Sequence, residues 1–287
     1  MLDLNFLQDQ VFLKELESFP IKEQHLKVEL LDFSENPVAE IQGKCSSGSL
    51  NIDGTSSMRR TCTFTLIVDK DTYDLTNVES MISINKKIKL SIGYTNFMEK
   101  YKDYGDIIWF PLGIFIIVSP SINHSVSGAT INITAKDKMC LLNGEVGGSL
   151  PAPVSLHEKY IRISDEITQI EPVTIYDIIR EAVIHLGGED PAKVIINDVP
   201  LKIKKLMRYV GNKPIDFDIN GSETTDPNAV VRTLKHGDLA GYEWVDFTYP
   251  GELIKQAGEP VTAILDSIKA SLGNYEYFYD VNGKFVF

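Results

Sequence analysis

The residues best suited to chemistry in this chain are its histidines, and they stand far apart. None of the five has a cysteine or a second histidine at the spacing of a zinc site: His25, His124, His157, His185 and His236. The chain also lacks the GxSxG, HExxH, P-loop and dinucleotide-binding patterns. Asp and Glu together number 40, so a glycosidase-type carboxylate pair stays open, but no feature singles one out. The sequence therefore predicts no catalytic, cofactor-binding or metal site, and a protein that is not an enzyme.

Two of the histidines have local explanations. His25 falls at the exposed edge of the first predicted strand, and we interpret it as solvated rather than as a ligand. His185 lies near the C-terminal end of a predicted helix, where the helix dipole favours a cation. Neither position requires a functional role.

Two aspartate-rich segments resemble parts of calcium loops. Asp216–Gly221 reads DFDING, which matches the first six positions of an EF-hand loop. The twelfth position, which requires a bidentate glutamate, is Pro227. Around Asp69, Asp71 and Asp74 the glycine and the closing glutamate are also missing at the proper spacing. We therefore interpret both segments as polar turns without calcium.

The cysteines give no sign of a disulfide framework. There are three of them, Cys45, Cys62 and Cys140, and no pair has CxxC spacing. Cys62 alternates with Phe64 in a predicted strand and is expected to be a small core residue. We expect the chain to fold in a reducing cytoplasm.

Composition narrows the classes of partner. The chain has 287 residues, enough for two or three domains, and is 43% hydrophobic and 24% charged. Its formal net charge of −12 argues against binding to nucleic acid or to an anionic membrane, both of which favour an excess of Lys and Arg. The acidic N-terminal stretch is not expected to be a signal peptide. No apolar run approaches the roughly 18 residues of a spanning helix, so we expect no membrane insertion.

The stretch Ile41–Val68 carries the clearest strand pattern. Side chains alternate across a strand, and one face here is apolar: Cys62, Phe64, Leu66 and Val68. Asp53-Gly54 supplies a turn before this strand. Arg59-Arg60 stands at the strand entrance and is either a solvated strand end or an anchor for a carboxylate partner. We favour the solvated end, because exposed ion pairs contribute little.

Further alternating segments predict a small N-terminal β-barrel. They lie at 25–36, 87–94 and 129–135, together with the long apolar strand 107–118. Pro111 and Gly113 interrupt that strand, so a bulge or an edge is expected there. A short helix at 136–143, with Asp137 as N-cap, closes the barrel.

The second half of the chain reads as mixed. A Pro-Ala-Pro boundary at 151–153 precedes a helix at 173–186, which Thr174 caps. A second amphipathic helix covers 261–272 and ends at Gly273. An aromatic hairpin follows at 275–287, turning at Asn282-Gly283. Because its returning strand is short, we expect Lys284–Phe287 to pair with polypeptide outside this sequence.

The predicted fold class is mostly β with an α+β middle. The predicted division is an N-terminal arm (1–24), a β-barrel domain (25–150), a mixed α+β domain (151–250), and a helix plus hairpin (251–287) that begins a second barrel-like domain. The arm is either a helix on its own domain or a segment that reaches a neighbouring subunit.

Four stretches in this order resemble baseplate hub proteins of tailed bacteriophages, also called tail-hub or tail-associated proteins. They are GSLNIDGTSSMRRTCTFTL (48–66), the segment from FPLGIFIIVSP to GEVGG (110–148), VTIYDIIREAVIHLGG (173–188), and the segment from DFTYPGELIK to GKFVF (246–287). The resemblance covers most of the chain from about Leu26 onward. Its specificity comes from the order and spacing of the stretches, since none is a chemical motif.

The resemblance implies a structural role in the virion. It implies a homotrimer in the tail baseplate, with the tail tube or distal tail protein above, a spike, fibre or tail-tip protein below, and a lumen for DNA. Folding would take place in the host cytoplasm, without specific nucleic-acid binding. The alternative is the non-catalytic front part of a tail-associated cell-wall hydrolase. A weaker alternative is a carbohydrate-binding β domain.

Overall fold

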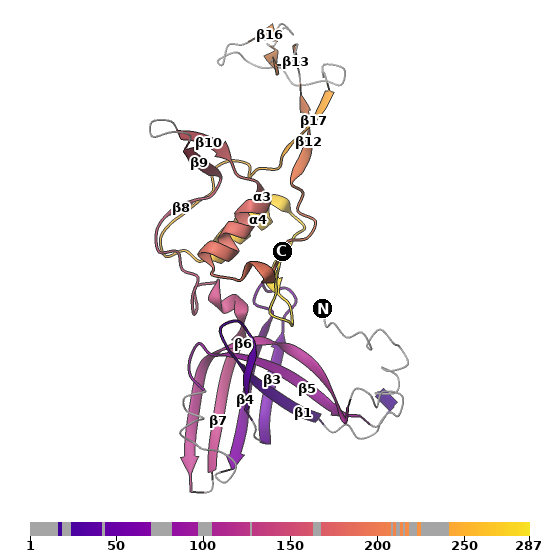
Figure 1. The fold of residues 1–287 in the computed structure, drawn as a ribbon, viewed down its shortest axis with the longest axis vertical. Coiled ribbons are helices and arrows are strands. Elements are labelled where there is room, and N and C mark those ends of the chain that lie inside the picture. The colour runs from indigo at the N-terminus through magenta and orange to yellow at the C-terminus, as the bar shows by residue number, and fades with distance from the viewer. Residues whose placement is uncertain are drawn as a thin grey trace. The chain divides into compact units, whose positions relative to one another are not determined.

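A computed structural model describes most of the chain in two compact units (Figure 1). The first unit combines residues 1–154, 180–197 and 254–287, and the second combines 155–179 and 198–253. The four-part division predicted from the sequence stays a prediction. The described residues are 17–18, 24–41, 44–69, 82–96, 105–126, 128–162, 168–207, 209–210, 213–214, 216–217, 223–224 and 241–287.

The first unit is built on a seven-stranded antiparallel sheet, so the prediction of a mostly β chain is confirmed. The strand order is β2-β1-β5-β6-β7-β4-β3. The strands are β1 (Gln24–Leu31), β2 (Pro37–Ile41), β3 (Lys44–Ile52), β4 (Arg60–Asp69), β5 (Lys87–Thr95), β6 (Ile107–Ser125) and β7 (Gly128–Asp137).

The sheet curls strongly, as Figure 1 shows, but its described hydrogen-bond ladder stays open. Its two edge strands follow one another in the chain, since β2 ends at Ile41 and β3 begins at Lys44. Three Cα–Cα steps reach at most about 11 Å, so the two edges must approach each other at this corner. The barrel expected from the sequence is therefore an open, curled sheet.

The concave side of this sheet holds the core of the first unit, as the alternation in β4 predicted. Phe64 is buried, and its neighbours Thr63 and Thr65 lie on the other face of the strand. The buried cluster draws on five strands and the turn before β5, and contains Val28, Leu30, Cys62, Phe64, Leu66, Ile82, Ile88, Leu90, Phe115, Ile117, Ile131, Ile133 and Ala135.

Strand β6 contains the bulge that Pro111 and Gly113 predicted. Opposite β5, Ser91 pairs with Pro111 and Leu90 with Gly113, so Leu112 is the extra residue. Gly113 has φ 145°, a backbone conformation that favours glycine. Although proline is rare in inner strands, the bulge lets β6 stay in the middle of the sheet.

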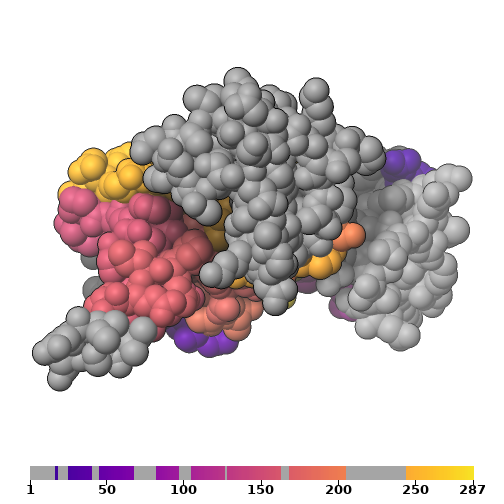
Figure 2. Space-filling view, turned by 90° about the horizontal axis from the view of Figure 1, so that it is seen from above, coloured from indigo at the N-terminus to yellow at the C-terminus, as the bar shows by residue number. Residues whose placement is uncertain are grey.

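A turn of 3₁₀-helix, η2 (Lys138–Leu141), follows β7, and Asp137 caps it as predicted by accepting from the Met139 amide at 3.0 Å. Further on, η4 (Pro191–Lys193) leads into β11 (Val194–Ile195). The backbone amide of Leu150 donates to Glu259 O at 2.8 Å. In Figure 2 the pink surface, which includes the stretch around Leu150, lies against the gold surface, which includes the stretch around Glu259.

The C-terminal helix and hairpin match their prediction in position. Helix α4 spans Val261–Leu272 and ends at Gly273, whose φ is 85°. Strands β19 (Phe278–Tyr279) and β20 (Phe285–Val286) form the hairpin. Its aromatic rings contact one another in the pairs Tyr275–Phe287, Tyr277–Phe285, Tyr277–Phe287 and Tyr279–Phe285.

The expectation that Lys284–Phe287 needs polypeptide from outside the sequence is wrong. Strand β20 pairs in parallel with β11, as well as antiparallel with β19. The Phe287 amide donates to Ile195 O at 3.0 Å, and the Asn197 amide donates to Phe287 O at 3.0 Å. The hairpin thus has its third strand within the same unit.

The predicted helix at 173–186 is present but begins two residues later. It starts as α3 (Ile175–Arg180) and continues as a π-helical stretch, η3 (Glu181–Leu186). Thr174 caps it as predicted, because its Oγ1 accepts from the Asp177 amide at 3.1 Å. The apolar stripe is buried: Ile175, Ile178, Ile179, Ala182 and Val183.

Apart from residues 175–179 of α3, the second unit is described as short two-stranded ribbons. Its longer strands are β9 (Glu158–Arg162) paired with β10 (Thr168–Pro172), and β12 (Lys202–Met207) paired with β17 (Gly241–Asp246). The shorter ones are β13 (Tyr209–Val210) with β14 (Lys213–Pro214) and β15 (Asp216–Phe217) with β16 (Glu223–Thr224). Strands β8 (Val154–Ser155) and β18 (Ile254–Lys255) lie at the unit boundaries.

Candidate functional site

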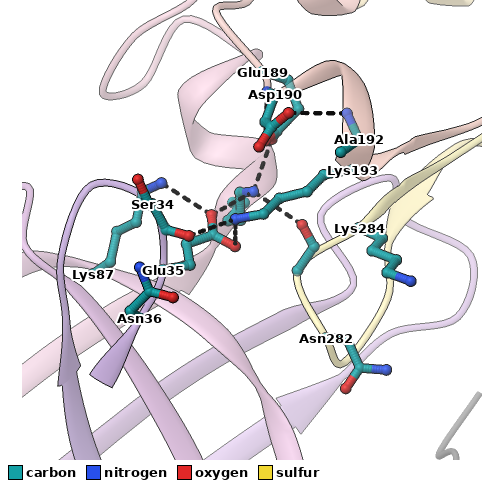
Figure 3. A network of polar contacts seen from close by, with 12 residues as sticks. Ser34, Glu35, Asn36, Lys87, Glu189, Asp190, Ala192, Lys193, Asn282 and Lys284 are labelled. Carbon is teal, nitrogen blue, oxygen red and sulfur yellow. Dashed lines mark hydrogen bonds and ion pairs between the residues drawn. The ribbon is translucent and has the colours of Figure 1, made fainter. Parts of the chain in front are cut away.

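The first unit contains a group of charged side chains, buried or partly buried, that we call the buried charge cluster (Figure 3). It comprises Glu35, Lys87, Lys138, Glu189 and Lys193. Glu35 lies in the turn between β1 and β2, Lys87 opens β5, Lys138 opens η2, and Lys193 closes η4. Segments distant in the sequence therefore meet at one carboxylate.

Glu35 forms ion pairs with three lysines. Its Oε1 lies 2.6 Å from Lys138 Nζ and 2.9 Å from Lys87 Nζ, and its Oε2 lies 2.8 Å from Lys193 Nζ. Lys138 is shared, because its Nζ also lies 2.8 Å from Glu189 Oε2. The Glu35 side chain is 4% exposed and that of Lys138 is 1% exposed. These are buried charges, which persist only when paired.

The electrostatic balance at Glu35 favours the carboxylate. Burial by itself opposes ionisation, but the lysines outweigh it, with Lys138 contributing most, and lower the pKa of Glu35 to about 2. Glu35 also has φ 70°, a conformation that non-glycine residues rarely adopt. The turn is therefore held in an uncommon shape by the contacts of its own side chain.

Lys138 connects this cluster to the C-terminal hairpin. Its Nζ donates to Gly283 O at 2.9 Å and lies 4.8 Å from the centre of the Tyr279 ring. The Tyr279 hydroxyl donates in turn to Glu189 Oε2 at 2.8 Å. Burial, followed by the charge of Glu189, raises the pKa of Tyr279 well above its ordinary value. The tyrosine hence remains a neutral donor.

Arg60 makes a second connection between the same parts. It is 5% exposed, and its guanidinium donates to three backbone carbonyls: Leu112 at 3.3 Å, Asp280 at 2.8 Å, and Tyr279. Its own amide donates to Asp137 Oδ2 at 3.0 Å. The interpretation of Arg59-Arg60 as a solvated strand end is therefore wrong. Arg60 is an anchor, although its acceptors are carbonyls rather than a carboxylate.

Arg59 contacts the hairpin from the other side of the strand. Its guanidinium carbon lies 3.6 Å from the centre of the Phe278 ring, and it forms an ion pair with Glu276. Two adjacent arginines therefore hold the hairpin at two places: Arg60, the first residue of β4, and Arg59, the residue before it. The two arginines thus bind backbone carbonyls, an aromatic ring and a carboxylate.

The predicted histidines do not converge. His25 is not simply solvated, because its Nε2 lies 3.0 Å from Thr95 Oγ1. His157 Nδ1 accepts from the Leu253 amide at 3.2 Å. The remaining positions are scattered: His124 on β6, His185 on η3, and His236 outside the described residues. No group of three His, Cys, Asp or Glu side chains within the described ranges could hold a metal ion.

The two aspartate segments are described only in part. Of Asp216–Gly221, the structure gives Asp216–Phe217 as β15, and the other residues lie outside the described ranges. Asp71 and Asp74 also lie outside them. The prediction that neither segment binds calcium therefore stays a prediction.

The cysteines differ sharply in environment. Cys62 is a core residue, as predicted, and burial raises the pKa of its thiol to about 12. Burial likewise raises the pKa of Cys140 to about 12. Cys45 is exposed on β3, and all three thiols are free. Only the Cys45 thiol combines exposure with access to reagents.

The buried charge cluster was not found by sequence reasoning. Glu35 and Lys138 each look like an ordinary polar residue of a turn or helix end, and their partners lie far away in the chain. One local signal was present, since Lys138 stands directly before the apolar run Met139–Leu142. A lysine that is buried together with such a run requires a counter-charge.

Comparisons with known proteins give a limited result. No family model matches the chain, and no curated protein matches it. One solved structure similar to it is the tail protein from Neisseria meningitidis MC58, with a TM-score of 0.42, 11% identity, and coverage of 91% of this chain and 49% of that one. Another is the prophage MuSo2 43 kDa tail protein from Shewanella oneidensis, with a TM-score of 0.41, 12% identity, and coverage of 92% and 55%.

The chain thus spans about half the length of these two neighbours. In the part of the chain that the structure describes, no helix has the length and apolarity needed to cross a membrane.

Proposed function

We propose that this chain is a structural protein of a phage tail or phage-like particle, and specifically a baseplate hub protein. The proposal rests on the four stretches that resemble hub proteins, and one structural observation supports it. Arg60, in the first stretch, donates to Leu112 in the second and to Tyr279 and Asp280 in the fourth. The residues that carry the resemblance are therefore joined by one set of hydrogen bonds.

The buried charge cluster fits the same role. Lys138, in the second stretch, donates to Gly283 in the fourth and pairs with Glu189, which directly follows the third. Buried ion pairs with several partners fix geometry more than they add stability. An adaptor between a tail tube and a spike must hold its parts in a fixed arrangement, which this bonding favours.

The acidic character suits a passage for DNA. The net charge of −12 disfavours adhesion of a polyanion, and like charge keeps DNA from binding to a wall that it must pass. In this proposal three copies form a ring, with a tube or distal tail protein on one side and a spike, fibre or tail-tip protein on the other. The ring belongs to the virion and its subunits fold in the host cytoplasm.

The decisive experiment is the mass of the purified chain by light scattering together with negative-stain images. A trimer that forms a ring with a central opening supports the hub. A monomer without a ring at every accessible concentration contradicts it. Antibodies against the chain should also label the distal end of tails isolated from the source organism, and labelling elsewhere would contradict the baseplate location.

A further inference from the structure

A pocket of about 200 Å³ adjoins the buried charge cluster. It is formed within the first unit by the turn between β1 and β2, by β5 and β6, by η4 and by the turn of the C-terminal hairpin. Its lining includes Ser34, Glu35, Lys89, Ile114, Lys193 and Asn282. In Figure 3, Lys193 reaches from η4 to the carboxylate of Glu35, and Asn282 lies on the hairpin turn. Because Ser34 and Asn282 are exposed, the pocket opens to solvent.

Lys89 lines this pocket without a counter-charge. It is half-buried on β5, and among the residues that the structure describes it has no ion-pair or hydrogen-bond partner. Glu29 lies opposite Lys89 on β1, but its carboxylate pairs with Lys27 at 3.1 Å. The ammonium group of Lys89 is therefore free to bind an anion from outside the chain.

The charges around the pocket leave a positive excess. The buried charge cluster contains three lysines and two glutamates, and Lys89 adds a fourth ammonium group. Glu35 also lines the pocket, but three lysines share its carboxylate. A locally cationic pocket thus lies in a chain whose formal net charge is −12.

The aspartates of the same three turns do not supply the missing counter-charge. Asp32 and Asp190 each accept from a backbone amide of their own turn, and Asp280 accepts from two. None of these three is among the described residues that line the pocket. Their carboxylates therefore stabilise the turns and leave Lys89 without a contact.

Two neutral donors accompany the lysines. The Ser34 hydroxyl and the Asn282 side-chain amide have no hydrogen-bond partner within the described part of the chain. An ammonium group combined with N–H and O–H donors is the usual setting for a carboxylate or phosphate oxygen, because charge-assisted hydrogen bonds are the strong ones. The lining of the pocket provides this combination.

We propose that this pocket binds an oxyanion, namely a phosphate or carboxylate group. The Lys89 ammonium group supplies the main charge contact, and Ser34 and Asn282 supply neutral donors. Lys193 adds its charge while it stays paired with Glu35. A ligand bound in this way joins the turn between β1 and β2 to the sheet and to the hairpin. The proposal does not depend on a role in a phage tail.

Calorimetric titration tests the site directly. Inorganic phosphate and sodium acetate are titrated separately into the full chain at low ionic strength, with sodium chloride of equal ionic strength as the blank. Saturable binding of at least one anion is expected. Binding of phosphate alone identifies a phosphate group as the ligand, and binding of acetate identifies a carboxylate, such as an acidic side chain of a partner. No saturable binding of either anion would overturn the proposal.

Two variants separate this site from general attraction of anions. Lys89→Gln should weaken binding at least about tenfold, because the unpaired charge is lost. The matched control is Lys255→Gln, which changes a half-buried lysine of β18 outside the pocket and should alter the affinity less than about twofold. Equal weakening by both variants would overturn the proposal.

Hydrogen exchange gives a local readout. With the bound anion at saturation, the amides of residues 281–284 should exchange more slowly in the native chain, because the ligand holds the hairpin turn. The same anion should have no such effect in Lys89→Gln, and β7 serves as the control region in both. An equal effect in the native chain and in Lys89→Gln, or no effect in the native chain, would overturn the proposal.

Discussion

At the scale of single residues, the first unit contains charged side chains that are buried together with their counter-charges, as Glu35 is with Lys138. Glu35 compensates three lysines, and Lys138 compensates two glutamates. Removing one member leaves the others in a low-dielectric site without a partner, which costs more than the pair contributes. The cluster is therefore sensitive to conservative changes.

We expect Glu35→Gln to lower the free energy of unfolding by about 3–5 kcal/mol, because three lysines lose their shared counter-charge. Urea titration followed by circular dichroism measures the change. The matched control is Glu145→Gln, which removes a carboxylate that is 41% exposed and paired with Lys136 at 2.9 Å. Its cost should stay below about 1 kcal/mol. Equal costs for both variants would show that the cluster is not effectively buried.

The pH dependence of the same residue follows from its lowered pKa. In the unfolded chain Glu35 titrates near 4.5 and in the folded chain near 2. The stabilisation by this carboxylate is therefore complete above pH 4.5 and is lost as the pH falls towards 2. The stability gap between the native chain and Glu35→Gln should be constant above pH 4.5 and shrink below it. A gap independent of pH down to 2 would contradict the assignment.

At the scale of elements, β4 joins the core to the C-terminal hairpin. Phe64 is 5% exposed and belongs to the buried cluster. Phe64→Ala should lower the free energy of unfolding by about 3–5 kcal/mol, from lost burial and a cavity. Thr63→Ala, on the opposite face of the strand, serves as control and should cost about 1 kcal/mol or less. A small cost for Phe64→Ala in urea titration would place the strand in another register.

For the C-terminal hairpin, the structure reverses the expectation from the sequence, because the partner strand of Lys284–Phe287 lies within the chain. Because β20 has partners on both sides, the amides of Phe285–Phe287 should exchange slowly. We expect protection comparable with that of Thr61–Leu66 in β4, measured by hydrogen exchange and mass spectrometry. Fast exchange throughout Tyr277–Phe287 would show that the pairing with β11 is not maintained in solution.

Local patterns predicted the elements far better than their pairing. Helix α4, the Asp137 cap and the Asn282-Gly283 turn depend on neighbours within a few residues, so periodicity and turn chemistry suffice. The pairing of β20 with β11 and the ion pair of Glu35 with Lys138 join residues distant in the chain. A local signal can mark a buried lysine such as Lys138, but it does not identify the distant partner, and for that reason the third strand and the cluster were missed.

At the scale of the whole molecule, the charged side chains of Glu35, Lys138 and Arg60 are held in ion pairs and in hydrogen bonds to backbone carbonyls. The purified chain should leave the turbidity of a cell-wall suspension unchanged, since its sequence lacks a catalytic constellation. Lysozyme in a parallel sample is the positive control. A loss of turbidity that disappears on substitution of one carboxylate or histidine would contradict this and support a hydrolase.

The sheet order also determines when the first unit becomes complete during synthesis. Val28 lies opposite Leu90, and Phe64 lies opposite Ile133. Such long-range pairing is slow, because each loop must close before its contacts form. Glu35 cannot pair with Lys193, nor Lys138 donate to Gly283, until these later residues have left the ribosome. The nascent sheet therefore lacks Glu189, Lys193 and Gly283 as partners until the chain has grown well beyond β7, a period in which binding by a chaperone would protect it from aggregation.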